Sequence, residues 1–265
     1  MNKAILILLL LSVVITMSSS RRSGQNTDAW NKKKCAVVLT YDDALNIHLD
    51  QVIPALDSFN FKATFYLTGY SPGFSNRIAD WRKVAKNGHE LGNHTLFHPC
   101  TGGPGREWVS AERDLSHYTV KRIEDEIKMN NILLQSVDGK TRRTFAYPCG
   151  DTDAGGTSYV DAIKDDFAAA RGTREGMVSR GTIDLFNIDC YAMNGQTGEE
   201  MIDIVRKALK QGGLVVFLFH GVGGEHNLNV SLRNHSQLLH FLKENEKEIW
   251  IAPLIDVVDY IQTKN

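Results

Sequence analysis

Short apolar runs typical of β-strands alternate with amphipathic segments typical of helices from residue 35 to the C-terminus. The clearest strand spans residues 214–219, an unbroken apolar run of the kind that is buried on both faces of a parallel sheet. The clearest helix begins at Thr197, where Glu200 completes a capping-box pattern, and it stops at Gly212. Because parallel strands need long crossovers between them, this alternation predicts an α/β fold built on a parallel sheet or barrel.

The remaining elements follow from the same patterns, and no internal repeat or low-complexity linker divides them. We expect strands at residues 37–40, 63–67, 90–93, 144–148, 167–171, 185–191, 214–219 and 249–251. We expect helices at residues 46–59, 76–86, 106–137, 159–164, 197–210, 231–246 and 255–262. Residues 35–265 are therefore predicted to form a single domain, since this length supports one full α/β core.

The N-terminal residues 1–20 have the layout of a secretory signal peptide. A short positive start precedes an apolar stretch at residues 4–15, which is too short to span a membrane, and three small residues at 18–20 favour cleavage there. An uncleaved N-terminal anchor is the alternative. Residues 21–34 are predicted to be a flexible lead-in, and no other membrane segment is evident. The protein is expected to be secreted or periplasmic, with no membrane span after cleavage.

Charge and cysteine content narrow the class of protein further. The formal net charge is −1 and no long basic block occurs, so nothing favours binding to nucleic acid or to an anionic membrane. In an exported protein, four cysteines allow up to two disulfides with three possible connectivities. A buried, inert thiol remains the alternative for each of Cys35, Cys100, Cys149 and Cys190.

Polar side chains follow the ends of several predicted strands. Asp42 and Asp43 come shortly after residues 37–40, and His94 and His98, spaced i, i+4, follow residues 90–93. Adjacent carboxylates repel unless a cation lies near them, and two histidines at this spacing readily complete a metal site. Each pattern alone also has a purely structural explanation: the aspartate pair can form a turn, and the histidine pair can lie on a solvent-exposed face. Active sites of parallel barrels, however, lie at the carboxyl ends of strands. Asp189, His220 and residues 148–151 belong to the same predicted rim.

In order along the chain, these segments resemble the motifs of the polysaccharide deacetylase family (NodB homology, carbohydrate esterase family four). The family's Thr-Phe-Asp-Asp-Gly corresponds to residues 40–44, Thr-Tyr-Asp-Asp-Ala, and its His-Ser/Thr-x-x-His to residues 94–98. Its Arg-x-Pro-x-Gly keeps Pro148 and Gly150 but has Ala146 in place of arginine. Its Asp-x-x-Asp-Trp keeps only Asp189, and its final Leu-x-His is present at residues 218–220.

The resemblance implies a distorted (β/α) barrel of about seven parallel strands and a metal-dependent hydrolase. The reaction is removal of N- or O-linked acetyl groups from an oligo- or polysaccharide, such as a chitooligosaccharide, peptidoglycan or acetylxylan. Asp43, His94 and His98 correspond to the metal ligands, and one divalent ion, Zn²⁺ by default, is the expected cofactor. Asp42 corresponds to the general base and His220 to the general acid. We expect a monomer.

Three further residues follow from the third motif. Tyr147, Pro148 and Cys149 are expected at the substrate or oxyanion, with the backbone N–H of Cys149 beside the acetyl oxygen. Asp189 is expected to support the acid histidine. Because Ala146 cannot brace the catalytic aspartate as the family's arginine does, either another cation takes that role, with Arg143, Arg171 and Arg174 as candidates, or Asp42 relies on the metal and on backbone donors.

Two alternatives remain. The first is a catalytically weakened carbohydrate-binding protein of the same fold, favoured by the missing arginine and tryptophan but opposed by the retained ligands, base and acid. The second, a metalloprotease, lacks its H-E-x-x-H motif. On the loop after residue 221, Glu225 and His226 are interpreted either as substrate contacts or as ordinary surface residues.

Overall fold

The computed structural model describes residues 30–264, so the predicted signal peptide at 1–20 lies outside the described residues. Of the predicted lead-in at 21–34, only residues 30–34 are described. Trp30 is fully buried, and its indole N–H donates to the carbonyl of Gly212 at 2.6 Å. The packed domain therefore begins before the predicted boundary at Cys35. Among the described helices, none is long and apolar enough to cross a membrane.

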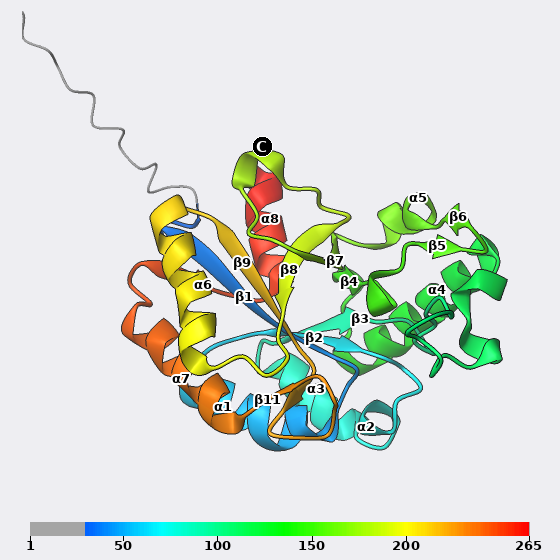
Figure 1. The fold of residues 1–265 in the computed structure, drawn as a ribbon, viewed down its shortest axis with the longest axis horizontal. Helices are drawn as coiled ribbons and strands as arrows, with labels where there is room; N and C mark the ends of the chain where they lie inside the picture. The colour runs from blue at the N-terminus through cyan, green and yellow to red at the C-terminus, as the bar shows by residue number, and fades with distance from the viewer. Residues whose placement is uncertain (1–29, 265) are drawn as a thin grey trace, which may run out of the picture.

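Seven parallel strands close into a barrel, which confirms the predicted fold (Figure 1). Around the barrel they run β1, β2, β3, β4, β7, β8 and β9, and pairing of β9 with β1 closes the ring. Their bounds are β1 (Cys35–Asp42), β2 (Thr64–Leu67), β3 (Glu90–Asn93), β4 (Phe145–Ala146), β7 (Ala170–Glu175), β8 (Ile188–Ala192) and β9 (Leu214–Phe219). The strand β12 (Ile249–Ile251) pairs with the start of β1, whereas β2 pairs with its end.

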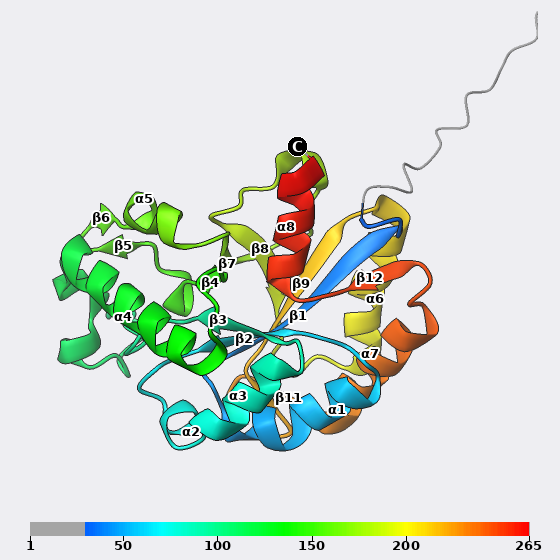
Figure 2. The same ribbon diagram turned by 180° about the vertical axis from the view of Figure 1, so that it is seen from behind.

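Helices connect most of these strands, and most of the helices cover the outside of the barrel (Figures 1 and 2). They are α1 (Ile53–Ser58), α2 (Pro72–Ser75), α3 (Ile78–Lys86), α4 (Val120–Asp138), α5 (Val160–Ile163), α6 (Gly198–Gln211), α7 (Leu232–Glu244) and α8 (Leu254–Lys264). A π-helical turn, His48–Val52, leads into α1, and two-residue strands pair as β5 (Asp153–Ala154) with β6 (Thr157–Ser158) and β10 (Gly221–Val222) with β11 (Asn229–Val230). Short 3₁₀ turns lie at Ala111–Arg113, Leu115–His117, Pro148–Gly150, Lys164–Asp166 and Arg180–Thr182.

Successive side chains of β1 point to opposite faces of the strand, and the two faces belong to two separate hydrophobic cores. Its odd-numbered residues, such as Val37 and Leu39, pack in one cluster with side chains of α1, α3, α6 and α7. Its even-numbered residues, such as Ala36 and Val38, belong to a second cluster inside the barrel, which also includes residues of α8. Asp42 is even-numbered and is the last residue of the strand, so the alternation that builds the core also directs this carboxylate toward the barrel interior.

The same alternation places Tyr41 in the outer core rather than at a substrate surface. Its ring stacks between Phe65 and Phe219, with centroids 5.1 and 5.3 Å away. Its hydroxyl forms a hydrogen bond of 2.7 Å with Nε2 of His235. The buried ring of Tyr41 thus helps to fix the end of β1 directly next to Asp42.

Several of the predicted segments begin later in the structure than expected. The helix expected at 106–137 begins only at Val120, where Thr119 caps it by accepting from the amide of Arg122 at 3.2 Å. The strands expected at 167–171 and 185–191 begin later, at Ala170 and Ile188. In consequence, Asp189 lies near the start of β8 and not after its carboxyl end, and Arg171 lies inside β7.

Candidate active site

The two adjacent aspartates reach one site because the backbone turns sharply between them. Asp42 ends β1 and is 2% exposed, while Asp43 and Ala44 adopt left-handed conformations with φ of 78° and 55°. Neighbouring side chains on a regular strand point to opposite faces, and non-glycine residues seldom adopt positive φ. The amide of Asp43 still donates to the carbonyl of Tyr66 at 3.1 Å, which holds the turn against β2. Strain of this kind is typical of functional sites.

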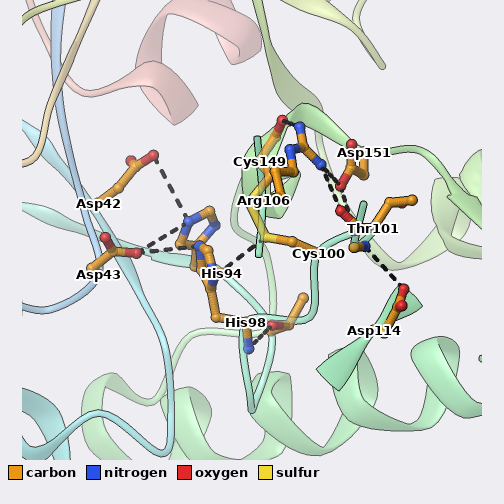
Figure 3. Close-up of a disulfide and its surroundings, with 12 residues drawn as sticks. Asp42, Asp43, His94, His98, Cys100, Thr101, Arg106, Asp114, Cys149 and Asp151 are labelled. Atoms are coloured by element: carbon orange, nitrogen blue, oxygen red, sulfur yellow. Dashed lines mark hydrogen bonds and ion pairs between the residues drawn. A yellow bond between two sulfur atoms is a disulfide. The ribbon is translucent and has the colours of Figure 1, made fainter. Parts of the chain in front are cut away.

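The two histidines follow β3 on a similarly strained turn. Thr95 and His98 have φ of 62° and 55°, and the amide of His98 donates to Oγ1 of Thr95 at 2.8 Å. Nδ1 of His94 lies 2.8 Å from the carbonyl oxygen of Ala146, which fixes the proton on Nδ1 and leaves Nε2 with a free lone pair. Nε2 of His94 and Nε2 of His98 lie 3.5 and 3.4 Å from Oδ1 of Asp43 (Figure 3).

This donor set fits a divalent transition metal. The ligand atoms of Asp43, His94 and His98 all lie within 4.8 Å of one another. Ligands about 2.0–2.1 Å from a tetrahedral zinc ion are separated by ~3.3 Å, close to the observed nitrogen-to-oxygen distances. The hydrogen bond from His94 to Ala146 is the kind of outer contact that orients metal-ligating histidines. His98 also lies near the sulfurs of Cys100 and Cys149, but these form a disulfide and provide no thiolate.

The electrostatics of the site suit metal binding at neutral pH. Burial tends to raise the pKa of Asp43, but the surrounding His98, His94, His220 and His226 outweigh it and lower the pKa to about 2. Burial lowers the pKa of His94 to about 4. Asp43 is therefore ionised and His94 neutral at pH 7, which are the protonation states that metal ligation requires.

Asp42 is held by Arg171, one of the three cations considered as substitutes for the missing arginine. Nη2 of Arg171 donates to Oδ2 of Asp42, both side chains are buried, and Nη1 donates to the carbonyl of Gly172 at 2.8 Å. Burial tends to lower the pKa of Arg171, but the charge of Asp42 outweighs burial and raises it. The other two candidates are engaged elsewhere, Arg143 with Asp138 and Arg174 with Asp189.

His220 follows β9 and faces the aspartates. Its Nε2 lies 3.9 Å from Oδ2 of Asp43, and burial lowers its pKa. Its carbonyl forms a 2.8 Å hydrogen bond with Nε2 of the buried His48. Nδ1 of His220 is buried and has no hydrogen-bond partner among the described residues.

The expected support of His220 by Asp189 is not found. Asp189 accepts from Nε of Arg174 at 2.7 Å, and its neighbour Cys190 belongs to the barrel interior. Because successive residues of a strand point to opposite faces, Asp189 is directed away from the barrel interior. The acidic groups that face His220 are instead Asp42 and Asp43.

The third-motif loop is buried where a substrate contact was predicted. The ring of Tyr147 is 1% exposed and its hydroxyl donates to the carbonyl of Phe186 at 3.0 Å, so it presents no face to a ligand. Pro148 is buried as well. Cys149 has φ of 57° and is only half-buried. Of the three predicted residues, it is therefore the one whose backbone can still contact a substrate.

A disulfide between Cys100 and Cys149 joins the histidine loop to the third-motif loop (Figure 3). Asp151 strengthens this link by accepting from the amide of Thr101 at 2.8 Å and from Nη1 of Arg106. Nη2 of Arg106 donates to the carbonyl of Cys149 at 3.2 Å. Sequence patterns did not single out Arg106, because Asp151 and Cys149, which it contacts on the third-motif loop, lie more than forty residues away along the chain.

The polysaccharide deacetylase family model matches residues 30–163, just over half of the chain. The chain belongs to the polysaccharide deacetylase family. An uncharacterized Bacillus subtilis protein, YlxY, is 31% identical over 105 residues, which are 40% of this chain and 28% of that protein. The peptidoglycan-N-acetylmuramic acid deacetylase PdaA of Bacillus subtilis is 26% identical over 123 residues, which are 44% of this chain and 39% of PdaA. The chain thus spans less than half of either relative.

Solved structures of polysaccharide deacetylases share the fold. A Mycobacterium smegmatis protein assigned to these deacetylases has a TM-score of 0.60 at 14% identity, covering 88% of this chain and 91% of that one. An acetyl xylan esterase from Clostridium thermocellum in complex with a cobalt ion has a TM-score of 0.50 at 19% identity, covering 84% and 90%. A family four pseudoenzyme from Bacillus anthracis has a TM-score of 0.50 at 18% identity, covering 86% and 66%.

Proposed function

We propose that this polysaccharide deacetylase family member hydrolyses acetyl groups, N- or O-linked, from a carbohydrate such as a chitooligosaccharide, peptidoglycan or acetylxylan. One observation carries the proposal. Oδ1 of Asp42 is buried without a hydrogen-bond partner among the described residues, beside the Asp43, His94 and His98 triad, while Arg171 occupies Oδ2. A buried carboxylate oxygen that is left unpaired is costly for stability, and it suits a group that accepts a proton during a reaction.

In this proposal Asp43, His94 and His98 hold one divalent ion. When bound, that ion acts as a Lewis acid toward the acetyl carbonyl and toward the attacking water. Zinc is the default for a set of two imidazoles and one carboxylate, and the cobalt in the Clostridium thermocellum esterase supports a first-row metal.

The other residues move protons. Oδ1 of Asp42 takes a proton from the water whose oxygen forms the new bond to the acetyl carbon. Nε2 of His220 gives a proton to the leaving nitrogen or oxygen as its bond to that carbon breaks, so acetate and a free amine or hydroxyl result. The amide of Cys149 is the proposed donor to the acetyl oxygen.

An exported location is part of the proposal. The disulfide between Cys100 and Cys149 supports it, because disulfides persist in oxidising compartments. The predicted signal peptide at residues 1–20 points the same way.

A catalytically weakened carbohydrate-binding protein is the second candidate. Nδ1 of His220 has no hydrogen-bond partner in the described part of the chain, and this favours the second candidate, because no acidic side chain there orients the ring in the manner expected for Asp189. The pseudoenzyme from Bacillus anthracis is an example with the same fold. The retained base, acid and ligands favour the enzyme.

The deciding experiment is an acetate-release assay on chitooligosaccharides, peptidoglycan and acetylxylan, with zinc-loaded protein and with chelator. We expect release that the chelator abolishes. Asp42→Asn should lose turnover and keep its metal, whereas His94→Ala should lose both. Glycan binding by the zinc-loaded protein without acetate release would favour the second candidate, and an Asp42→Asn variant as fast as wild type would refute the assignment of the base.

A further inference from the structure

Another histidine, His226, lies beside His220 at the active site, on the loop between β10 and β11. The loop is tied down by Glu225, which accepts from Nδ2 of Asn46 at 2.7 Å and from the amide of Ile47 at 2.6 Å. Glu225 itself has φ of 66°, an unfavourable conformation for a non-glycine residue. These contacts hold the loop across the start of the helical segment that follows Asp43, so the position of His226 is set by the fold.

The ring of His226 lies parallel to that of His220. Their centroids are 4.7 Å apart and their planes differ by 13°. Nε2 of His226 is 3.8 Å from Oδ2 of Asp43, close to the corresponding 3.9 Å for His220. Oδ1 of Asp43 faces the two ligand histidines, so this carboxylate divides the site into a metal side and a side with two stacked imidazoles.

The hydrogen bonding of His226 determines which nitrogen carries its proton. The amide of Leu228 donates to Nδ1 of His226 at 3.0 Å, so the neutral ring has its proton on Nε2. A protonated Nε2 is a donor and not a metal ligand. At 3.8 Å, Oδ2 of Asp43 is too far to accept a hydrogen bond from it, and the described residues offer this N–H no closer acceptor. The side chain is 31% exposed, which leaves room for a ligand to supply that acceptor.

We propose that His226 binds the substrate by donating from Nε2 to a hydroxyl or ether oxygen of the acetylated sugar, on the side where His220 protonates the leaving group. The inference rests on the proposed deacetylase function. The ring of His226 is parallel to that of the acid histidine, and its N–H has no acceptor within hydrogen-bond distance in residues 30–264, so a carbohydrate oxygen can fill that place. His226 is then a substrate-binding residue additional to the base, the acid and the metal ligands.

The test compares two substitutions that remove different properties of the ring. His226→Phe keeps a flat ring to stack on His220 but removes the donor. His226→Gln loses the ring, yet its amide N–H₂ is as many bonds from Cβ as Nε2 of histidine. We expect His226→Phe to lower kcat/KM for acetate release at least 10-fold, with metal content and Tm unchanged, and His226→Gln to stay within about threefold of wild type. His240→Phe, on the exposed face of α7, is the matched control and should behave as wild type.

A purely structural role makes the opposite forecast, since packing against His220 tolerates phenylalanine and suffers from glutamine. That reversed order, or wild-type kinetics for both variants, would overturn the proposal.

A second measurement does not need turnover. In ¹⁵N-histidine NMR spectra of the zinc-loaded Asp42→Asn protein, His226 should be the neutral Nε2–H tautomer, and its Nε2 resonance should move on addition of penta-N-acetylchitopentaose or acetylated xylooligosaccharide. A proton on Nδ1, or no movement at a saturating concentration of a glycan that binds, overturns the inference. If wild type releases no acetate, the proposed deacetylase function is refuted, but the proposed binding role of His226 is not.

Discussion

Arg171 in β7 forms a buried ion pair with Asp42 at the end of β1, across 129 residues of sequence. The guanidinium also lies over the ring of Tyr66, with its central carbon 5.1 Å from the ring centroid. The arginine that the family carries in its third motif is replaced here by Ala146, and Arg171 pairs with Ala146 across the β4–β7 register. A cation has thus been kept beside Asp42, but it is supplied by the neighbouring strand.

Replacing Arg171 with methionine should destabilise the protein strongly. The change leaves the charge of Asp42 buried without its partner, and breaking a buried pair in this way typically costs about 3–5 kcal/mol. Urea unfolding measures the loss. The matched control is Arg174→Met, whose ion pair with Asp189 has an arginine side chain 66% exposed, so this change should be nearly neutral.

The double variant Arg171→Met/Asp42→Asn separates the charge from the packing. If the unpaired carboxylate causes the loss, the double variant is more stable than Arg171→Met alone. Equal stability of the two variants would show instead that the packing of Arg171 against Tyr66 accounts for the effect.

The disulfide between Cys100 and Cys149 should stabilise both the fold and the metal site. It closes a loop across a sequence separation of 49 residues, for which chain entropy gives about 4 kcal/mol as an upper value. It also fixes the backbone next to His98. We therefore expect Cys100→Ser/Cys149→Ser to unfold at lower urea concentration and to bind zinc more weakly than wild type.

Reducing agent provides the control for that experiment. It should shift the unfolding curve of wild type toward that of the double variant and leave the double variant unchanged. Cys35 and Cys190 are free and buried, so a reductant has no second bridge to break in the described residues. Zinc affinity that is identical with and without the bridge would contradict the proposed link to His98.

The residues of the candidate site were predictable because they sit in short contiguous motifs. Asp42, Asp43, His94, His98 and His220 each lie at or just after the carboxyl end of a buried strand, and parallel strands bring such ends to one rim. The structure brings these side chains together, while their roles stay predictions. What the motifs could not provide was long-range pairing: three arginines were equally eligible to brace Asp42, and three disulfide connectivities were open.

The late start of the predicted helix and the misplacement of Asp189 have local causes. The segment at 106–119 was expected to be helical, but the carboxylate of Asp114 accepts from the amides of Gly102 and Ser116, at 3.0 and 2.9 Å. An aspartate that bonds to nearby amides competes with the helical backbone. Asp189 was misplaced by a shift of strand boundaries, since the strand predicted at 185–191 begins only at Ile188, which puts Asp189 near its start.

Acid should destabilise the metal-free protein through its buried neutral histidines. Burial lowers the pKa of His235 and of His48 from 6.5 to about 4. Between these values the unfolded chain binds protons that the folded chain does not, so stability falls as the pH decreases from 6.5 toward 4. Each group contributes on the order of 3 kcal/mol across this window.

Urea unfolding at a series of pH values, in the presence of chelator, measures this dependence. His235→Gln should flatten the curve, because glutamine does not titrate, whereas the exposed His240→Gln should leave its slope unaltered. Equal stability of wild type at pH 7 and pH 4.5 would contradict destabilisation by protonation of the buried histidines.

Zinc should raise the Tm of the protein through the candidate ligands. An ion that binds only the folded state stabilises it by about 2.7 kcal/mol at a free concentration one hundred times Kd. His94→Ala removes a ligand whose Nε2 lies 3.5 Å from Oδ1 of Asp43, so zinc should no longer shift its Tm. Asp42→Asn removes a charge that is already paired with Arg171 and should keep the shift. Differential scanning fluorimetry with zinc and with chelator compares the three proteins. Loss of the shift in Asp42→Asn would place Asp42 among the ligands and leave the proposed base without support.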